Sequence, residues 1–364
     1  MLAGLNPDFW KGKKVFLTGH TGFKGAWLAY WLIGLGAKVT GYALAPSTFP
    51  SMYDLLKLDE MMDSVFGDIR DSVKLRAELE KAQPEVVLHL AAQPIVSVGY
   101  EAPAQTFETN IMGVVHLLDI CREMSEKLSI LIISSDKCYS NNDEGKAFTI
   151  NDALGGNDPY SASKAGTEIV VGAYRSSYFQ DPNGPVISSA RAGNVIGGGD
   201  WSVNRLLPDG ARAFSAGCPL VLRNPESIRP WQHVIEPLYG YLLLVQAMVS
   251  DRSYSQAWNF GPSIQNERSV GQIAQLFAQA WGDDAKIELL QGSQNWKEAM
   301  TLNLDCSETN DKLNWRPVLD FETTIEWTAN WYKDFYSDMS KEGIRTQTKF
   351  QIDEYVKLQS DYAF

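Results

Sequence analysis

A glycine-rich turn between an apolar run and a helical pattern constrains the fold of this chain most. Lys14–Thr18 is a short apolar run, and Thr18-Gly-His-Thr-Gly-Phe-Lys-Gly25 follows it directly. Its three glycines remove three β-carbons, so backbone N–H groups and a helix N-terminus can approach a pyrophosphate. The alternative is a tight turn whose glycines only allow the helix to pack closely on the strand. We interpret Lys24, beside this turn, as a solvated helix residue.

Strand and helix signals alternate through the first half of the chain. After 14–18, strands are expected at 37–43, 64–68, 85–90, 129–134 and 185–190, and helical patterns cover 111–124 and 161–178. Strands separated by helices of about a dozen residues pair in parallel. We therefore predict an α/β protein with a Rossmann-type doubly wound parallel sheet and a second, smaller α/β substrate lobe. Ligands bind such sheets at the carboxyl ends of the strands.

The second lobe is expected to begin where this alternation stops, after Arg191. A glycine-rich loop, Gly193-Asn-Val-Ile-Gly-Gly-Gly-Asp-Trp201, follows, and beyond it short segments mix with prolines and tryptophans. We predict a dinucleotide-binding domain made of residues 1–190 plus roughly 230–260. Residues 191–229 and 261–364 would then form the substrate-binding domain, so the two domains interleave along the chain.

The charge of the chain argues against several classes of partner. With 32 basic and 44 acidic residues the formal net charge is −12, which does not suit nucleic acid or an anionic membrane surface. The four cysteines and four histidines are widely spaced, so we expect no metal site. The N-terminus lacks the basic-then-apolar layout of a signal peptide, and the apolar run Ala26–Leu35 is too short to span a bilayer. By elimination, we expect a reducing, cytoplasmic location.

The end of the second expected strand leaves the choice of dinucleotide open. An acidic residue there usually binds the adenosine ribose of NAD, and a nearby arginine accommodates the 2′-phosphate of NADP. The segment Gly41-Tyr-Ala-Leu-Ala-Pro-Ser47 contains neither. This criterion therefore does not distinguish NAD from NADP. Asp68 and Ile69, after the third strand, can supply adenine contacts, although Asp68 can equally be a turn residue.

Two further segments carry groups suited to acid–base chemistry. Tyr160 and Lys164 are four residues apart, so they share one helix face, and a neighbouring ammonium lowers the pKa of a tyrosine. Tyr160 is therefore a candidate general base. Asp136 and Lys137 stand at the carboxyl end of the strand expected at 129–134. They are either groups that act on a bound substrate or a solvated ion pair of little energetic weight.

Together these segments resemble the extended short-chain dehydrogenase/reductase family. The glycine turn and Tyr160-x-x-x-Lys164 carry the resemblance, and Ser135 stands at the place of the serine or threonine of the family's triad. Leu90-Ala-Ala92, Thr109-Asn110, Arg229-Pro-Trp231 and Trp315-Arg-Pro317 extend it over nearly the whole chain. Within the family the chain is most similar to the nucleotide-sugar 4,6-dehydratases, related members of which have Asp-Glu where this chain has Asp136-Lys137.

The resemblance implies a hydro-lyase that uses NAD and a nucleotide sugar, CDP-glucose. The implied product is CDP-4-keto-6-deoxy-D-glucose, on a route to the deoxysugars of lipopolysaccharide O-antigen. Asp136 matches the acid that protonates the C6 hydroxyl, and Lys137 replaces the glutamate base. Lys137 removes the C5 proton only if its pKa is depressed, and otherwise it stabilises the enolate. A C4 epimerase or reductase leaves the pair unexplained, and a non-catalytic NAD-binding sensor is a remote alternative.

The residues and the resemblance together assign the binding roles. For the cofactor we expect Gly19, Thr21, Gly22, Phe23, Gly25, Asp68, Ile69, Leu90, Ala91, Ala92, Tyr160 and Lys164. For the substrate we expect Gln93, Tyr100, Asn194, Arg205, Arg223 and Arg229. Arginine forks match phosphate oxygens, although each arginine can instead be solvated or bridge the lobes. Because relatives pair through a four-helix bundle, we expect a homo-oligomer, a dimer or tetramer, that associates through helices 111–124 and 161–178.

Overall fold

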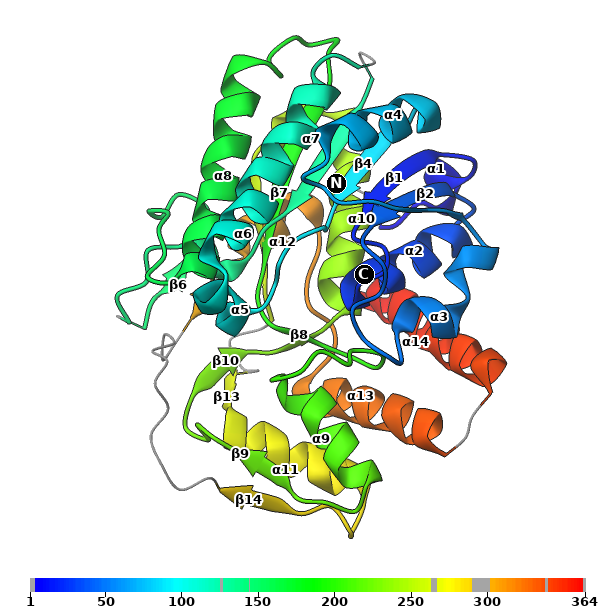
Figure 1. Ribbon diagram of the computed structural model, residues 1–364, viewed down its shortest axis with the longest axis vertical. Helices are drawn as coiled ribbons and strands as arrows, with labels where there is room; N and C mark the ends of the chain where they lie inside the picture. Colours follow the sequence, from blue (N-terminus) through cyan, green and yellow to red (C-terminus); the bar gives the residue numbers. More distant parts are fainter. Residues whose placement is uncertain are drawn as a thin grey trace.

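A parallel sheet of seven strands forms the centre of the molecule (Figure 1). The computed structural model describes residues 4–124, 127–143, 145–262, 267–289, 302–337 and 340–362. The strand order is β12-β7-β5-β4-β1-β2-β3, with β1 Lys14–Thr18, β2 Lys38–Ala43, β3 Asp63–Phe66, β4 Val86–His89, β5 Ser129–Ile133, β7 Val186–Ala192 and β12 Ala257–Phe260. The chain winds outward from β1 to β3 and then crosses to β4 on the other side of β1. This confirms the predicted Rossmann-type, doubly wound sheet.

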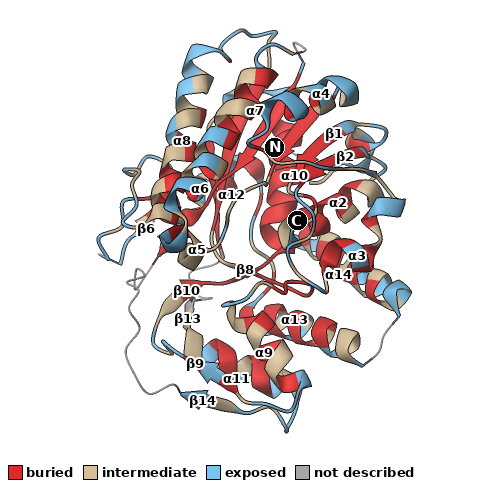
Figure 2. Ribbon diagram, viewed as in Figure 1, coloured by how far each residue is buried: buried red, intermediate tan, exposed pale blue. Residues whose placement is uncertain are grey.

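Helices cover both faces of this sheet and bury its strands. On one face lie α2 Phe23–Gly34 and α10 Ile235–Ser250, and on the other α4 Ser72–Ala82, α7 Gly113–Cys121 and α8 Pro159–Ser177. In β1, Val15 and Leu17 belong to the first core and Phe16 to the second, because successive side chains of a strand point to opposite faces. Strands β4, β5 and β7 are buried along their whole length (Figure 2).

The expected elements of the first half are present, with one difference in the helix predicted at 111–124. There the chain forms a π turn over Glu108–Met112 before α7 begins. Inside that turn the Asn110 amide accepts a hydrogen bond from Gln93 N at 2.8 Å and donates to Ser163 Oγ at 2.8 Å. These contacts tie the turn to the loop after β4 and to α8. They depend on distant residues, so local periodicity does not reveal them.

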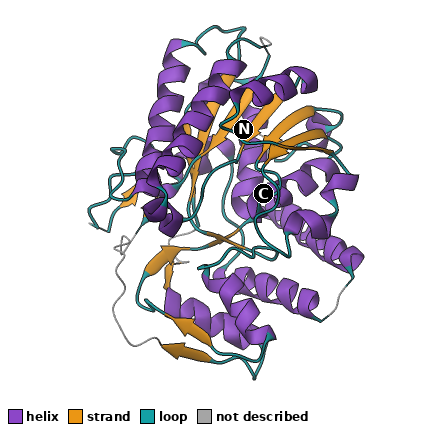
Figure 3. Cartoon of the chain, in the orientation of Figure 1, coloured by secondary structure: helices purple, strands orange, loops and turns teal. Residues whose placement is uncertain are grey.

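The second lobe lies across the carboxyl ends of the strands and has only short strands of its own (Figure 3). It contains α9 Leu206–Ser215, β9 Leu220–Leu222, β13 Glu267–Ser269, α11 Val270–Trp281, β14 Ile287–Leu289 and α13 Phe321–Tyr336. The other elements are α1 Pro7–Trp10, α3 Met52–Leu56, η1 Leu58–Glu60, α5 Val96–Glu101, α6 Pro103–Phe107, η3 Asp136–Cys138, β6 Ala147–Phe148, β8 Val195–Ile196, β10 Ile228–Pro230, β11 Gln232–His233, η4 Arg252–Tyr254, β15 Asn303–Leu304, α12 Ser307–Leu313 and α14 Lys341–Tyr362. Within the described ranges, no helix combines the length and apolar character needed to cross a membrane.

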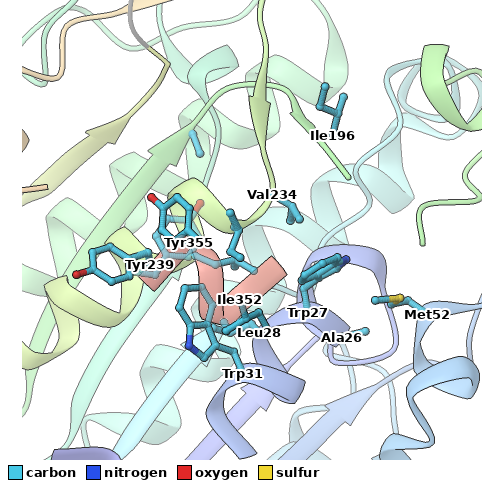
Figure 4. Packing of buried hydrophobic residues seen from close by; sticks show 14 of the residues in the cluster. Ala26, Trp27, Leu28, Trp31, Met52, Ile196, Val234, Tyr239, Ile352 and Tyr355 are labelled. Atoms are coloured by element: carbon cyan, nitrogen blue, oxygen red, sulfur yellow. The ribbon is translucent and has the colours of Figure 1, made fainter. Parts of the chain in front are cut away.

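The last helix, α14, packs against the dinucleotide-binding half. Its Ile352 and Tyr355 join Trp27 and Trp31 of α2 and Tyr239 of α10 in one buried cluster (Figure 4). Burial of such aromatic side chains is a major source of stability. The predicted domain boundaries assign α14 to the substrate-binding domain. These boundaries stay a prediction.

Candidate active site

A cavity of about 960 Å³ lies at the carboxyl ends of the strands, between the sheet and the second lobe. Its walls come from the segments that follow β1, β2, β3, β4, β5 and β7, and from α9 and β9. This is where a doubly wound sheet binds its ligands. The residues singled out in the sequence all line it: Gly19, Thr21, Gly22, Phe23, Gly25, Asp68, Ile69, Leu90, Ala91, Ala92, Gln93, Tyr100, Ser135, Asp136, Lys137, Tyr160, Lys164, Asn194, Arg205, Arg223 and Arg229.

Two glycines of the turn, Gly19 and Gly25, leave no room for a side chain. Gly19 has φ +79°, and a Cβ there would lie 2.8 Å from Ala91 N. A Cβ on Gly25 would lie 2.0 Å from Gly19 O. Gly22 is the N-cap of α2 and supplies no side-chain hydrogen bond to it. The first N–H groups of α2 therefore stay available to an anionic ligand such as a pyrophosphate, so the turn fits a dinucleotide.

The segment after β2, where an acidic residue usually binds the adenosine ribose, contributes a backbone oxygen instead. Thr21 Oγ1 donates to Leu44 O at 2.8 Å, which ties the glycine turn to the segment after β2. Asp68 lines the cavity, and its carboxylate forms a fork with Arg70, with Nη2 to Oδ2 at 2.6 Å and Nε to Oδ1 at 3.0 Å. The hydrogen bonds from Arg70 lower the pKa of Asp68 despite its partial burial. Asp68 is therefore ionised and oriented by Arg70.

Asp136 is a buried acid and not a solvated surface group. It is 2% exposed, in the 3₁₀ turn η3 at the end of β5. Ser135 Oγ donates to Asp136 Oδ1 at 2.9 Å and accepts from Lys137 N at 3.2 Å. Burial raises the pKa of Asp136, although the charges of Lys137 and Arg229 and the Ser135 hydrogen bond oppose the shift. A raised pKa favours the protonated carboxyl, which is the form that can donate a proton.

Tyr160 and Lys164 lie on the first turns of α8. Asp158 caps this helix by accepting from Ser161 N at 3.0 Å, and Pro159 occupies its first position. Lys164 Nζ donates to Ile133 O at 3.4 Å, and burial lowers the pKa of Lys164 to about 8. Burial raises the pKa of Tyr160 to about 12, while a Ser135 hydrogen bond and the charge of Arg205 act in the opposite direction. The predicted lowering of the Tyr160 pKa by Lys164 is therefore wrong, because burial raises it and the opposing effects come from Ser135 and Arg205.

A buried ion pair between Glu168 and Arg191 lies near Lys164, and it was not predicted from the sequence. Glu168 stands one helical turn after Lys164, and its Oε2 accepts from Arg191 Nη2 of β7 at 2.7 Å and from Ser189 Oγ at 2.8 Å. Its Oε1 accepts a short hydrogen bond from Ser134 Oγ. Burial alone would raise the pKa of Glu168, but Arg191 and the two serines hold it below its ordinary value. This pair fixes α8 to the strand ends that carry the candidate catalytic residues.

Lys24 is not the solvated residue that the sequence suggested. It is half-buried, lines the cavity and donates from Nζ to Tyr241 Oη of α10 at 3.0 Å. Burial, followed by the nearby charge of Lys164, lowers the pKa of Lys24 to about 7. Its closeness to the glycine turn was the available signal, because residues in the first turn of such a helix border the cavity.

The predicted substrate-binding residues border the same cavity in different settings. The Gln93 amide is engaged by the protein, since Nε2 donates to Thr106 Oγ1 at 2.9 Å and Oε1 accepts from Ile95 N at 2.6 Å. Arg229 is buried, and Arg223 is exposed and donates to Asn204 Oδ1 at 3.2 Å. Arg205 precedes α9 and reaches Tyr160 electrostatically. The three arginines thus border the cavity, with the charge of Arg205 acting on Tyr160 and that of Arg229 on Asp136.

Comparison with known proteins agrees with this geometry. The profile of the family described as GDP-mannose 4,6 dehydratase matches residues 16–328. The chain belongs to this family. It is 45% identical over 334 residues to a CDP-glucose 4,6-dehydratase of Salmonella typhimurium, covering 90% of this chain and 93% of that protein.

Solved structures of this family's fold superpose closely. An epimerase of Methanothermobacter thermautotrophicus matches with a TM-score of 0.79 and 21% identity, covering 92% of this chain and 96% of that one. A dTDP-glucose 4,6-dehydratase of Bacillus anthracis, in complex with NAD, matches with a TM-score of 0.72 and 19% identity, covering 88% and 97%. At these identities the likeness concerns the fold alone.

Proposed function

We propose that this chain catalyses the NAD-dependent dehydration of CDP-D-glucose to CDP-4-keto-6-deoxy-D-glucose. The observation that carries the proposal is the buried Asp136, with Lys137 beside it, in the same cavity as Tyr160 and Lys164. A C4 oxidation needs only the tyrosine and its lysine, whereas loss of water needs an acid at C6 and a base at C5. The 45% identity with the Salmonella typhimurium enzyme supports cytidine as the nucleotide.

The dinucleotide is proposed to bind along the glycine turn. Gly19, Gly22 and Gly25 let the backbone approach its pyrophosphate, and Asp68, Ile69 and Leu90–Ala92 border the adenosine side. Lys164, on the face of α8 that carries Tyr160, orients the nicotinamide ribose. A bound NAD would supply hydride transfer, from C4 in the oxidation and back to C6 after loss of water, and the last step requires that a proton return to C5.

The residues of the chain move the protons of this scheme. Tyr160 Oη takes the proton of the C4 hydroxyl, with the Ser135 hydroxyl hydrogen-bonded to it. Ketone formation at C4 acidifies C5, because the carbanion becomes an enolate. Asp136 then donates its proton to the C6 hydroxyl, which leaves as water. Its burial favours the protonated form that this step requires.

Lys137 serves the C5 step in one of two ways. As a neutral amine it removes the C5 proton, and as an ammonium it stabilises the enolate oxygen while another group takes the proton. Lys137 lines the cavity and its backbone N–H is held by Ser135 Oγ at 3.2 Å. Either role places it beside the hexose, so both predict a defect in elimination when its amine is removed.

Product mass tests this proposal directly. The enzyme is incubated with NAD and, in parallel, with CDP-, UDP-, dTDP- and GDP-glucose. We expect the CDP-sugar to lose 18 mass units, whereas a C4 epimerase would leave the mass unchanged. Substrate with deuterium at C4 should give product labelled at C6. Label that escapes into free NADH, or an unchanged mass for every sugar, would contradict the proposed reaction.

A homo-oligomer and a cytoplasmic location remain part of the proposal. Three apolar side chains are exposed on or beside the predicted pairing helices: Met112 just before α7, Ile169 within α8 and Tyr178 just after α8. Association through these helices would cover them. Analytical ultracentrifugation should give a dimer or tetramer, and Ile169→Glu should shift it toward the monomer. A monomeric native protein would contradict this association.

A further inference from the structure

The cavity continues past the candidate catalytic residues into the second lobe. There its walls are the start of α9, the strand β9 and the segment Arg223–Asn224. If the proposed function holds, the hexose lies at Tyr160 and the dinucleotide occupies the glycine turn. The diphosphate and nucleoside of the substrate must then extend along α9 and β9.

The start of helix α9 contributes two charged side chains, Arg205 and Asp209, to this part of the cavity. Arg205, just before its first turn, is close enough to Tyr160 for its charge to act on that hydroxyl. Asp209 follows four residues later, in the first turn of α9, about 6 Å further along the axis. Asp209 also lines the cavity, with 38% of its side chain exposed. If the hexose lies at Tyr160 and the diphosphate at Arg205, Asp209 is among the cavity residues left for the nucleoside.

The negative charge of Asp209 would repel a diphosphate bound nearby, so a carboxylate at this position calls for a functional explanation. The other cavity-lining carboxylates of the described residues are placed differently: Asp136 is a candidate catalytic group, Asp68 and Glu101 belong to the sheet side, and buried Asp200 accepts from Ser202 N at 2.9 Å. Asp209 Oδ1 is held by a short bond from Arg212 Nη2. Arg212 is itself fixed, since Nη1 donates to Trp201 O at 3.0 Å.

The backbone of strand β9 provides a second set of hydrogen-bonding groups that a pyrimidine ring could use. Within the described part of the chain it pairs with β14 along one edge only. Leu220, Val221 and Leu222 all line the cavity. A pyrimidine against this strand can use its backbone N–H and C=O groups, which leaves the 4-position to be read by a side chain.

The 4-position separates cytosine from the other pyrimidines. Cytosine carries an amino group there, a donor that aspartate accepts, whereas uracil and thymine carry an acceptor oxygen. We infer that Asp209 selects the nucleotide by accepting a hydrogen bond from the cytosine N4 amino group, an inference that rests on the proposed function. Against uracil or thymine the same carboxylate meets O4, and two acceptors then face each other without a proton. The competing interpretation is an ordinary helical ion pair between Asp209 and Arg212.

Binding of free nucleotides tests the inference without turnover. Calorimetry of the NAD-loaded enzyme should give tighter binding for CDP than for UDP. Asp209→Asn, whose amide can donate to O4 and offers N4 only one neutral acceptor oxygen, should weaken CDP by about 5- to 150-fold, the range expected for one base-specific contact. The same variant should strengthen UDP, and the ratio of kcat/KM for CDP-glucose to that for UDP-glucose should fall accordingly.

Arg212→Gln is the matched control, because it breaks the same ion pair and keeps the carboxylate. It should retain the preference for CDP. Equal losses for CDP and UDP in Asp209→Asn, or a loss of preference in both variants alike, would overturn the inference and leave a structural ion pair. If the native enzyme prefers CDP but does not dehydrate CDP-glucose, the proposed reaction is overturned, but the recognition of cytosine by Asp209 is not.

Discussion

Loss of the Glu168 charge should destabilise the protein far more than loss of a surface carboxylate. The side chains of Glu168 and Arg191 are 1% and 5% exposed, so neither charge can be solvated when its partner is removed. In Glu168→Gln the shape stays nearly the same, but Arg191 keeps a buried positive charge, and its Nε already lacks a hydrogen-bond partner among the described residues. Breaking a buried ion pair in this way costs about 3–5 kcal/mol of unfolding free energy.

Urea denaturation of the cofactor-free protein measures this change. Glu342→Gln is the matched control, because the same substitution there breaks a helical pair between an exposed carboxylate and Arg345. Its expected cost is about 0.3–0.5 kcal/mol. If Glu168→Gln costs no more than about 1 kcal/mol, Arg191 must be solvated or re-paired, and the assigned role of the pair in fixing α8 is wrong.

Acidification should reveal the same charge. The pKa of Glu168 lies below its ordinary value in the folded protein, so its ionised form contributes stability above that ordinary value and loses it as the pH falls. Glu168→Gln should therefore flatten the acid limb of the stability curve. The negative charge of Glu168 also raises the pKa of Lys164 against the larger effect of burial. The alkaline limb of activity should move to lower pH in the variant.

Three further substitutions test the site. Gly25→Ala places a Cβ 2.0 Å from Gly19 O, so we expect a loss of about 1–3 kcal/mol in stability and weaker NAD binding by calorimetry; Gly172→Ala, whose Cβ meets nothing within 4 Å, is the control and should do neither. Lys137→Ala should still reduce NAD in a single turnover but dehydrate about 10²–10⁴-fold more slowly, and rapid dehydration would remove its role. Tyr160→Phe should lower C4 oxidation by a similar factor of about 10²–10⁴, measured as NADH absorbance.

Much of the sheet could be predicted because its strands are continuous apolar runs. Strands β4 and β5 are buried on both faces, so nearly every residue is apolar and the run itself marks them. Strand β12 is different, since Ala257–Phe260 includes a tryptophan and an asparagine and gains its identity only by pairing with β7. No local pattern distinguishes such a segment from a loop.

Within the site, motif residues could be predicted and their distant partners could not. The glycine turn and the Tyr160–Lys164 spacing depend on neighbours in the chain. The prediction of a solvated Lys24 is wrong because its partner Tyr241 comes 217 residues later in the chain. Glu168 lies one turn after Lys164, but its significance depends on Arg191, on a strand that follows α8. Tertiary contacts of this kind appear only when the elements are placed together.

The pairing of β12 with β7 has a consequence for how such a protein can be altered. The chain completes β7, builds α9 and β9 over the cavity, and only then returns to add α10 and β12 to the sheet. A chain that ends between β7 and α10 lacks the edge strand β12, and the apolar face of the sheet that α10 covers is then exposed. The substrate-facing half therefore cannot be excised or exchanged as a cassette. A new sugar-nucleotide preference has to arise by point changes around an intact frame.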